Sequence, residues 1–78
     1  MRFEPMKTLK NAAVGEKVRV CRINGTGPLQ RRMMDLGLLN GTEIFVRKVA
    51  PLGDPMAINV RGYELSLRKS EADVIVIE

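Results

Sequence analysis

Hydrophobic and polar positions alternate along most of this chain in short runs, a pattern typical of β-strands with one buried face. The first long run, 17–23, begins with Val18 and Val20 as its apolar positions. Its phase then shifts, because Cys21 and Ile23 are the next apolar residues. A β-bulge near Val20 and Cys21 produces such a shift by adding one residue to the strand, and a bend at a barrel corner is the alternative. We therefore expect a strand over 17–23 that changes face near its middle.

Four further runs predict strands downstream. Those at 42–49, 56–61 and 63–67 alternate, whereas 74–77 is continuously apolar. The residues expected to point inward from the alternating runs are Ile44, Val46, Met56, Ile58, Val60, Tyr63, Leu65 and Leu67. A continuous apolar run suits a strand that is covered on both faces. The chain is therefore expected to be mainly β.

One segment, 28–36, has the period of a helix instead. Leu29, Met33 and Leu36 are spaced at i, i+4 and i+7, which places them on one stripe. Proline suits the first helical position, and Gly37 offers a left-handed stop that lets the next leucine pack back onto the last turn. We expect one short α-helix here, with the leucine and methionine stripe in the core.

These elements predict a small barrel. Thr8 is expected to cap a helical turn that ends near Gly15, and a second helical turn is expected within 66–72. About five short strands favour a closed or nearly closed sheet, because closure removes exposed strand edges. We predict an SH3-like barrel with the helix 28–36 inserted after the first long strand, and an OB-like barrel is the alternative. Residues 1–78 are expected to form a single domain.

The composition excludes several kinds of site. The chain has one cysteine and no histidine, so it offers no internal disulfide, no four-ligand zinc site of nitrogen and sulfur donors, and no catalytic triad. Carboxylates fall singly apart from Glu71 and Asp73, so we expect no metal site within one chain, although a metal held between chains stays open. The segment 25–28 precedes the helix but lacks the Gly-Lys-Ser/Thr ending of a P-loop. We expect neither a cofactor nor an enzymatic activity.

The remaining features concern location and charge. The N-terminus shows no apolar leader, and no apolar run approaches the roughly 18–20 residues of a membrane span, so a cytoplasmic protein without direct membrane insertion is expected. A net charge of +4 allows an acidic partner without requiring one.

The segment 51–55 is the sharpest candidate for partner binding. Turn chemistry accounts for Pro51, Gly53, Asp54 and Pro55, because proline fixes φ, glycine accepts a positive φ, and aspartate bonds its own backbone. Leu52 is different, since an apolar side chain at a hairpin tip has little core to reach. We hypothesise that Leu52 docks onto a partner and that its four neighbours shape the loop.

The outer face of the predicted helix is the second candidate. Arg31 and Arg32 are either solvated charges with Asp35 as their ionic partner or a basic anchor for an acidic patch on another protein. Met34 lies off the apolar stripe, so it is a rim residue or an adaptable apolar contact. We include Arg31, Arg32 and Met34 among the expected partner-binding residues.

Three stretches of this sequence resemble one known family. The segment 31–38, RRMMDLGL, followed by Gly-Thr at 41–42, is similar to the helix and strand entry of FeoA proteins. The segment 50–55, APLGDP, resembles their hairpin loop, and 61–68, RGYELSLR, resembles a further family segment. The resemblance implies an SH3-like fold and an accessory role toward FeoB, a membrane ferrous-iron transporter with a GTP-binding domain. It also implies a family-level association with transition metals, and homo-oligomers are allowed.

Two other functions remain as alternatives. A nucleic-acid-binding barrel is permitted by basic residues at 47–48, at Arg61 and at 68–69, although such barrels stack bases on aromatic residues and this chain has only three. We therefore expect no nucleic-acid partner. A fragment of a metal-sensing repressor is the other alternative, but no helix-turn-helix precedes the predicted barrel.

Overall fold

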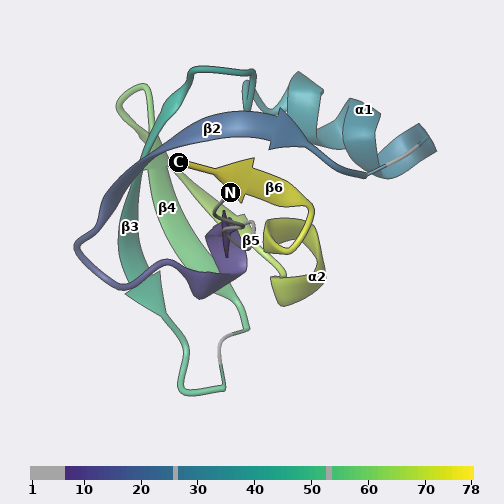
Figure 1. Cartoon of the computed structure of the whole chain (residues 1–78). Helices are drawn as coiled ribbons and strands as arrows, with labels where there is room; N and C mark the ends of the chain where they lie inside the picture. Colours follow the sequence, from purple (N-terminus) through teal and green to yellow (C-terminus); the bar gives the residue numbers. More distant parts are fainter. Residues whose placement is uncertain (1–6, 26, 53) are drawn as a thin grey trace, which may run out of the picture.

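The computed structural model describes residues 7–25, 27–52 and 54–78. Its strands, all paired antiparallel, are β1 (Lys7–Thr8), β2 (Lys17–Ile23), β3 (Glu43–Val49), β4 (Met56–Val60), β5 (Tyr63–Leu67) and β6 (Ile75–Ile77). The helical segments are the 3-10 turn η1 (Leu9–Asn11) and the helices α1 (Gly27–Asp35) and α2 (Lys69–Ala72). The molecule is mainly β, as predicted, and α1 follows the first long strand (Figure 1).

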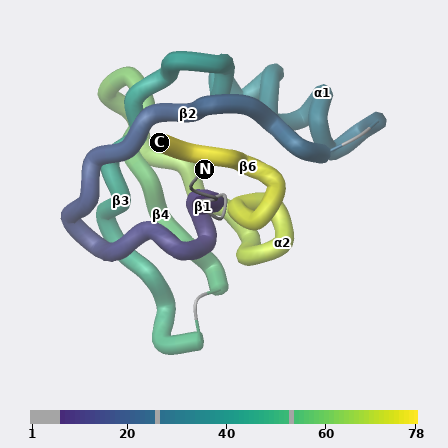
Figure 2. The backbone as a smooth tube through the Cα atoms, viewed as in Figure 1, coloured from purple at the N-terminus to yellow at the C-terminus, as the bar shows by residue number. Residues whose placement is uncertain are grey.

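The six strands form one curved sheet in the order β1-β6-β2-β3-β4-β5. About five strands were expected, and the additional one is the two-residue β1, which pairs with β6. In the tube view, β6 runs beside β2 and ends near the middle of the molecule (Figure 2). Among the described residues no ladder joins β1 to β5, so the sheet curls around the core without closing completely.

The inward face of β3 and β4 forms the centre of the core. Ile44 and Val46 on β3 and Met56, Ile58 and Val60 on β4 are all fully buried, which confirms the alternation expected for both strands. Strand β6 is buried at all of its residues and lies between β1 and β2, as its continuously apolar sequence predicts.

The inward prediction for β5 is wrong at Tyr63. Leu67 is buried and Leu65 is half-buried, but the Tyr63 side chain is 47% exposed. This residue pairs with Val60 at the end of the sheet, beyond the centre of the core. Its hydroxyl donates a hydrogen bond to the carbonyl oxygen of Leu36, 3.2 Å away. A tyrosine at this position satisfies its polar end at the exit of α1 instead of burying its ring.

Helix α1 lies within one residue of the predicted ends, 28–36. Met33 is fully buried, and Leu29 and Leu36 pack against the core from its rim, which confirms the apolar stripe. Gly37 follows with φ +91°, and its N–H donates to the Met34 carbonyl at 2.9 Å. The left-handed residue ends the helix and turns the chain back toward the core.

Two β-bulges decide which residues face solvent on the long strands. The register of β2 shifts between Val20 and Arg22, which confirms the expected bulge. Cys21 is nevertheless exposed, so its predicted inward position is wrong: as the inserted residue, it has no place in the inward alternation. A second bulge, not predicted, shifts the register of β3 between Val46 and Lys48.

The first helical turn is shorter than predicted. It is a 3-10 turn that ends at Asn11, not near Gly15, and the Thr8 side chain does not cap it. The Thr8 hydroxyl donates instead to the Asn11 side-chain oxygen at 3.2 Å. The second predicted turn, within 66–72, is confirmed as α2.

Candidate partner-binding surfaces

The predicted partner-binding residues fall into two separate regions of the molecule. The loop 51–55 joins β3 to β4 and projects from one end of the sheet, whereas α1 extends from the other end (Figure 1). We call the first region the loop tip, residues 51–55, and the second the helix face, which consists of Arg31, Arg32 and Met34. The structure does not bring the two regions together into one site.

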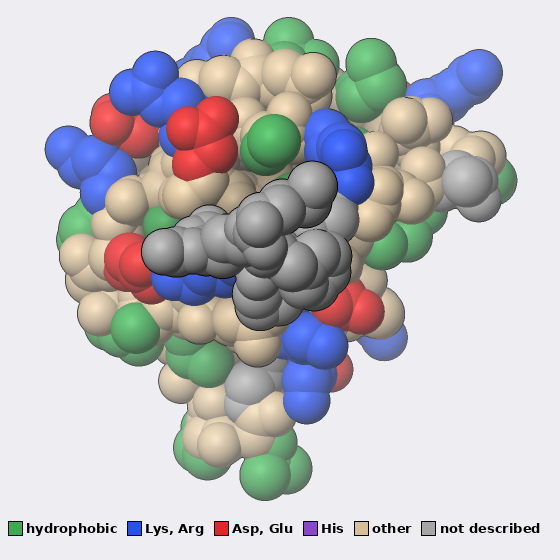
Figure 3. All heavy atoms as spheres, in the orientation of Figure 1, with side chains coloured by type: hydrophobic (Ala, Val, Ile, Leu, Met, Phe, Trp, Pro, Cys, Tyr) green, Lys and Arg blue, Asp and Glu red, His purple; other side chains and the backbone are tan. Residues whose placement is uncertain are grey.

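The loop tip presents its leucine to solvent. Leu52 is 87% exposed, the highest value among the exposed large hydrophobic residues. Pro51 and Pro55 are also exposed, and hydrophobic side chains gather at this end of the molecule in the space-filling view (Figure 3). The Ala50 N–H donates to the Pro55 carbonyl at 3.1 Å, which closes the base of the loop. Gly53, expected to have a positive φ, lies outside the described residues.

Asp54 anchors the loop to a distant part of the chain. Its Oδ1 accepts a hydrogen bond from the backbone N–H of Lys69 at 3.2 Å, at the start of α2. The sequence interpretation, in which Asp54 bonds its own local backbone, therefore missed the partner. A carboxylate at a helix start is favourable, because the first N–H groups of a helix lack partners within it. Asp54 thus fixes the side of the loop that follows Leu52.

Arg32 is an anchor on the helix face. Its Nε lies 3.2 Å from Oε2 of Glu71, a carboxylate whose residue is only 8% exposed. The other oxygen of Glu71 accepts a hydrogen bond from the Arg68 N–H at 2.8 Å. Within the described chain neither arginine forms an ion pair with Asp35, so the predicted pairing along the helix is wrong. Arg32 pairs with this tertiary neighbour instead of Asp35, because a buried carboxylate needs a cation more than an exposed one does.

The short segment 68–71 therefore joins both regions. It holds the loop tip through Asp54 and the helix face through Glu71. Tyr63, on the preceding strand β5, also contacts the end of α1 through the Leu36 carbonyl. The stretch 61–68, which resembles a family motif, contacts the motif-like stretch 31–38 through Tyr63. Lys69, the residue directly after it, contacts the motif-like stretch 50–55 through Asp54.

Met34 and Arg31 remain accessible on the helix face. Met34 is 50% exposed and lines a shallow depression of about 360 Å³ together with Leu39 and Arg22. Leu39 was not predicted as an exposed apolar residue. Leu38, the leucine expected to pack back onto the last turn after Gly37, is fully buried as predicted, and the leucine after it stays at the surface.

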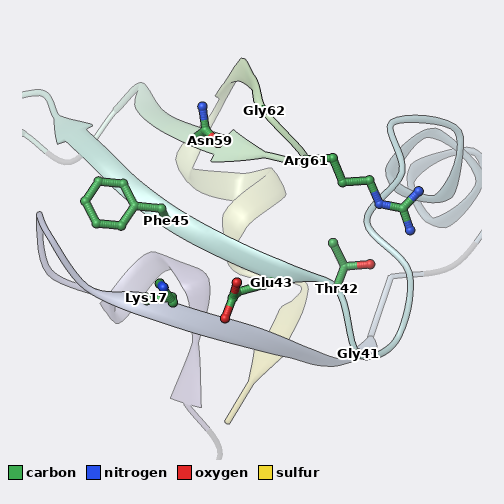
Figure 4. A pocket seen from close by; sticks show the side chains of 8 residues that line it. All are labelled: Lys17, Gly41, Thr42, Glu43, Phe45, Asn59, Arg61 and Gly62. Atoms are coloured by element: carbon green, nitrogen blue, oxygen red, sulfur yellow. The ribbon is translucent and has the colours of Figure 1, made fainter.

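The outward face of the sheet carries two depressions that the sequence did not predict. One, of about 670 Å³, lies where Phe45 and Asn59 face outward from β3 and β4 (Figure 4). Its charged side chains are of both signs, and Arg61 extends away from Lys17 and Glu43. The mixed charges give this depression no preference for an ion of one sign. The other depression is a groove beside the base of the loop tip.

One side of that groove is a tightly held turn before β2. The Glu16 carboxylate accepts a hydrogen bond from the Ala13 N–H at 2.9 Å and pairs with Lys7 at 2.9 Å. The bond from the Ala13 N–H, followed by the contact with Lys7, lowers the pKa of Glu16 below its usual value. Gly15, at φ +86°, donates its N–H to the Val46 carbonyl at 2.8 Å. Val14, between them, is left exposed at the surface.

The described residues offer limited chemistry for a metal. They include no cluster of three or more cysteine, histidine, aspartate or glutamate residues with the geometry of a metal site. The two neighbouring carboxylates noted in the sequence contact cations instead: Asp73 pairs with Lys10 at 3.0 Å, and Glu71 pairs with Arg32. None of the helices in the described ranges has the length and apolar character needed to cross a lipid bilayer.

Comparison with known proteins identifies the family. The sequence model of the FeoA domain matches residues 7–78. The chain is 31% identical over 70 residues to an Fe(2+) transport protein A/Fe(2+) transporter FeoB fusion protein of Porphyromonas gingivalis. That alignment covers 90% of this chain but only 8% of the fusion protein. The similarity therefore concerns a small part of that relative.

Solved structures agree with this result. An FeoA-like protein from Clostridium acetobutylicum superposes with a TM-score of 0.87 at 42% identity, covering 97% of this chain and 88% of the other. FeoA of Stenotrophomonas maltophilia, described as a prokaryotic SH3 domain protein and solved with zinc, gives 0.82 at 25% identity, covering 92% and 89%. The predicted SH3-like fold is confirmed. The chain belongs to the FeoA family, which is associated with ferrous-iron transport.

Proposed function

We propose that this protein is a cytoplasmic accessory protein of ferrous-iron transport that binds a FeoB-type transporter through the loop tip. The observation that carries the proposal is the exposure of Leu52 at the end of a loop whose base is fixed on both sides. The relative in which FeoA and FeoB are fused supports the choice of partner, because fused domains act at high effective concentration on one another.

The loop is suited to docking because it is already ordered at its base. Hydrogen bonds from the Ala50 N–H to Pro55 and from the Lys69 N–H to Asp54 hold its two ends. A preordered loop loses little conformational entropy when it binds. Burial of one leucine side chain in a partner pocket then contributes about 1.5–3 kcal/mol.

The helix face provides a second, electrostatic contact in this proposal. Arg31 is exposed, and Met34 beside it offers an adaptable apolar side chain. Charges at the rim of an interface mainly raise the rate of association and make it sensitive to salt. Because the two regions lie at opposite ends of the molecule, the transporter contacts the protein on two sides. The protein acts by binding and assembly, and the iron and nucleotide chemistry belongs to the transporter.

Binding to the cytosolic part of the transporter tests the proposal. We expect Leu52→Asp to weaken binding by at least about tenfold, because the leucine pocket must then accept a charge. Leu52→Met is the matched control, since it keeps an apolar side chain at the same position. Both variants should unfold at the wild-type temperature. Wild-type affinity in Leu52→Asp, measured by calorimetry, would show that the loop is structural only.

A further inference from the structure

A groove of about 430 Å³ lies on the outward face of the sheet beside the loop tip. Small side chains account for its depth. Ala57 on β4 lies directly opposite Ser66 on β5 and Lys48 on β3, so the middle of this row of three strands carries little side-chain volume. The next outward residue on β4 after Ala57 is Asn59, and it lines the neighbouring depression instead. The groove is therefore bounded along the strands.

The lining of the groove is mainly apolar. Val14, Val49, Ala50 and Pro55 contribute to it, together with Ala57. Val14 is 59% exposed, although the turn that carries it is held by hydrogen bonds to β3 and by the Glu16 side chain. Val14 therefore forms a fixed apolar wall on one side of the groove.

The charged residues that line the groove are both basic. Arg47 and Lys48 are exposed side by side because the bulge in β3 turns two successive residues outward. Arg47 has only a loose and exposed ionic partner, Glu64, at 3.7 Å. The neighbouring depression, in contrast, mixes both signs of charge. An apolar groove whose charged lining residues are both basic is complementary to apolar side chains that are flanked by carboxylates.

We propose that this groove, defined by residues 14, 47–50, 55, 57 and 66, binds a short acidic and apolar segment of a protein partner. Apolar side chains of the segment fill the groove, and its carboxylates pair with Arg47 and Lys48. The groove is continuous with the loop tip, because Ala50 and Pro55 line the groove and close the base of that loop. The identity of the partner rests on the proposed function, whereas the chemistry of the segment rests on the groove alone.

Two peptides test the chemistry without the transporter. We would titrate the isotopically labelled full chain with an acetylated and amidated peptide of sequence DLLEL, and with its basic counterpart KLLKL. We expect DLLEL to shift the amide resonances of residues 47–50, 57 and 66, with a dissociation constant of about 1 mM or lower. KLLKL should leave them unchanged at the same concentration. Absence of these shifts with DLLEL, or equal shifts with both peptides, would overturn the inference.

A matched pair of variants tests the site. Ala57→Asp places a negative charge in the groove, and Asn59→Asp places the same charge two residues away on the same face of the same strand. We expect DLLEL binding and transporter binding to fall at least about tenfold in Ala57→Asp and to change less than about twofold in Asn59→Asp. Equal losses in both variants would contradict a site in the groove. So would groove shifts on raising the concentration of the wild-type chain alone, because the occupant would then be a second copy.

The outcomes separate this inference from the proposed function. If Leu52→Asp loses transporter binding while Ala57→Asp keeps it, the groove inference is wrong and the proposed function stands. If DLLEL binds in the groove while the wild-type chain does not bind the transporter, the proposed function is wrong and the groove inference stands.

Discussion

The loop tip and the helix face are built from similar residue types, but the structure uses those residues in different ways. Each region has one charged residue that is tied to the segment 68–71: Asp54 in the loop and Arg32 on the helix. Each also has one large apolar residue left at the surface, Leu52 and Met34. The loop holds itself in place by hydrogen bonds to backbone, whereas the helix is held mainly by its buried stripe.

This comparison shows that an exposed charged residue at a candidate interface is not necessarily available to a partner. Asp54 and Arg32 are both exposed, yet each makes a contact that the fold itself uses. A substitution at either residue therefore disturbs the local structure as well as any interface. Leu52 and Met34 are better probes of binding, since little of the fold depends on them. Shortening side chains in the loop and in the helix should accordingly change the free energy of unfolding by different amounts.

The largest expected effect is on the helix side. Met33→Ala should lower the free energy of unfolding by about 2–5 kcal/mol, because it leaves a cavity where a fully buried side chain packs. Met34→Ala, one residue later and half exposed, should change it by less than about 0.5 kcal/mol. Urea denaturation of the two variants measures the difference. Similar losses in both would mean that Met33 does not lie on the buried side of the helix.

An intermediate effect is expected at the joint between the two regions. Glu71→Ala removes the acceptor of the Arg68 N–H and leaves Arg32 without its ionic partner. We expect a loss of about 1–3 kcal/mol in the free energy of unfolding. Glu64→Ala is the control, because it removes an exposed carboxylate whose contact with Arg47 is loose, and it should cost less than about 0.5 kcal/mol. If both variants lost the same free energy of unfolding, segment 68–71 would not hold the two regions in place.

The smallest effect is expected at the loop. Asp54→Ala should cost about 0.5–1.5 kcal/mol, because a single hydrogen bond to a backbone N–H is lost. Asp54→Asn keeps an oxygen acceptor and should cost less. Amide hydrogen exchange provides the sharper measurement: the Lys69 N–H should exchange faster in Asp54→Ala and at the wild-type rate in Leu52→Ala. An unchanged rate in Asp54→Ala would show that the loop is not anchored through this contact.

Much of the fold was predictable because the residues that determine it are local. Alternation predicted the inward faces of β3 and β4, and the helical stripe with its glycine stop predicted α1 within one residue at each end. The phase shift along β2 predicted its bulge. Leu52 was correctly singled out as exposed, since a leucine between prolines at a hairpin tip has nowhere to be buried.

The partners of the polar residues were not predictable in the same way. Asp54 and Lys69 are 15 residues apart, and Tyr63 and Leu36 are 27 apart. No periodicity connects positions at such separations. The groove was missed for a related reason, because it depends on Ala57 and Ser66 becoming neighbours across two strands and on a bulge in β3 that has no clear sequence signal.

The sequence by itself therefore determined the strands β2 to β6, the helix α1, their buried positions apart from Cys21 and Tyr63, and the exposed leucine of the loop tip. These features follow from patterns within a few residues, where backbone geometry and side-chain hydrophobicity act together. Only the tertiary structure decided that Asp54 and Arg32 are anchors and that the two candidate regions lie apart. It alone also placed a basic-edged groove beside the loop. Contacts between distant segments set these outcomes, and they exist only once the sheet has curled around its core.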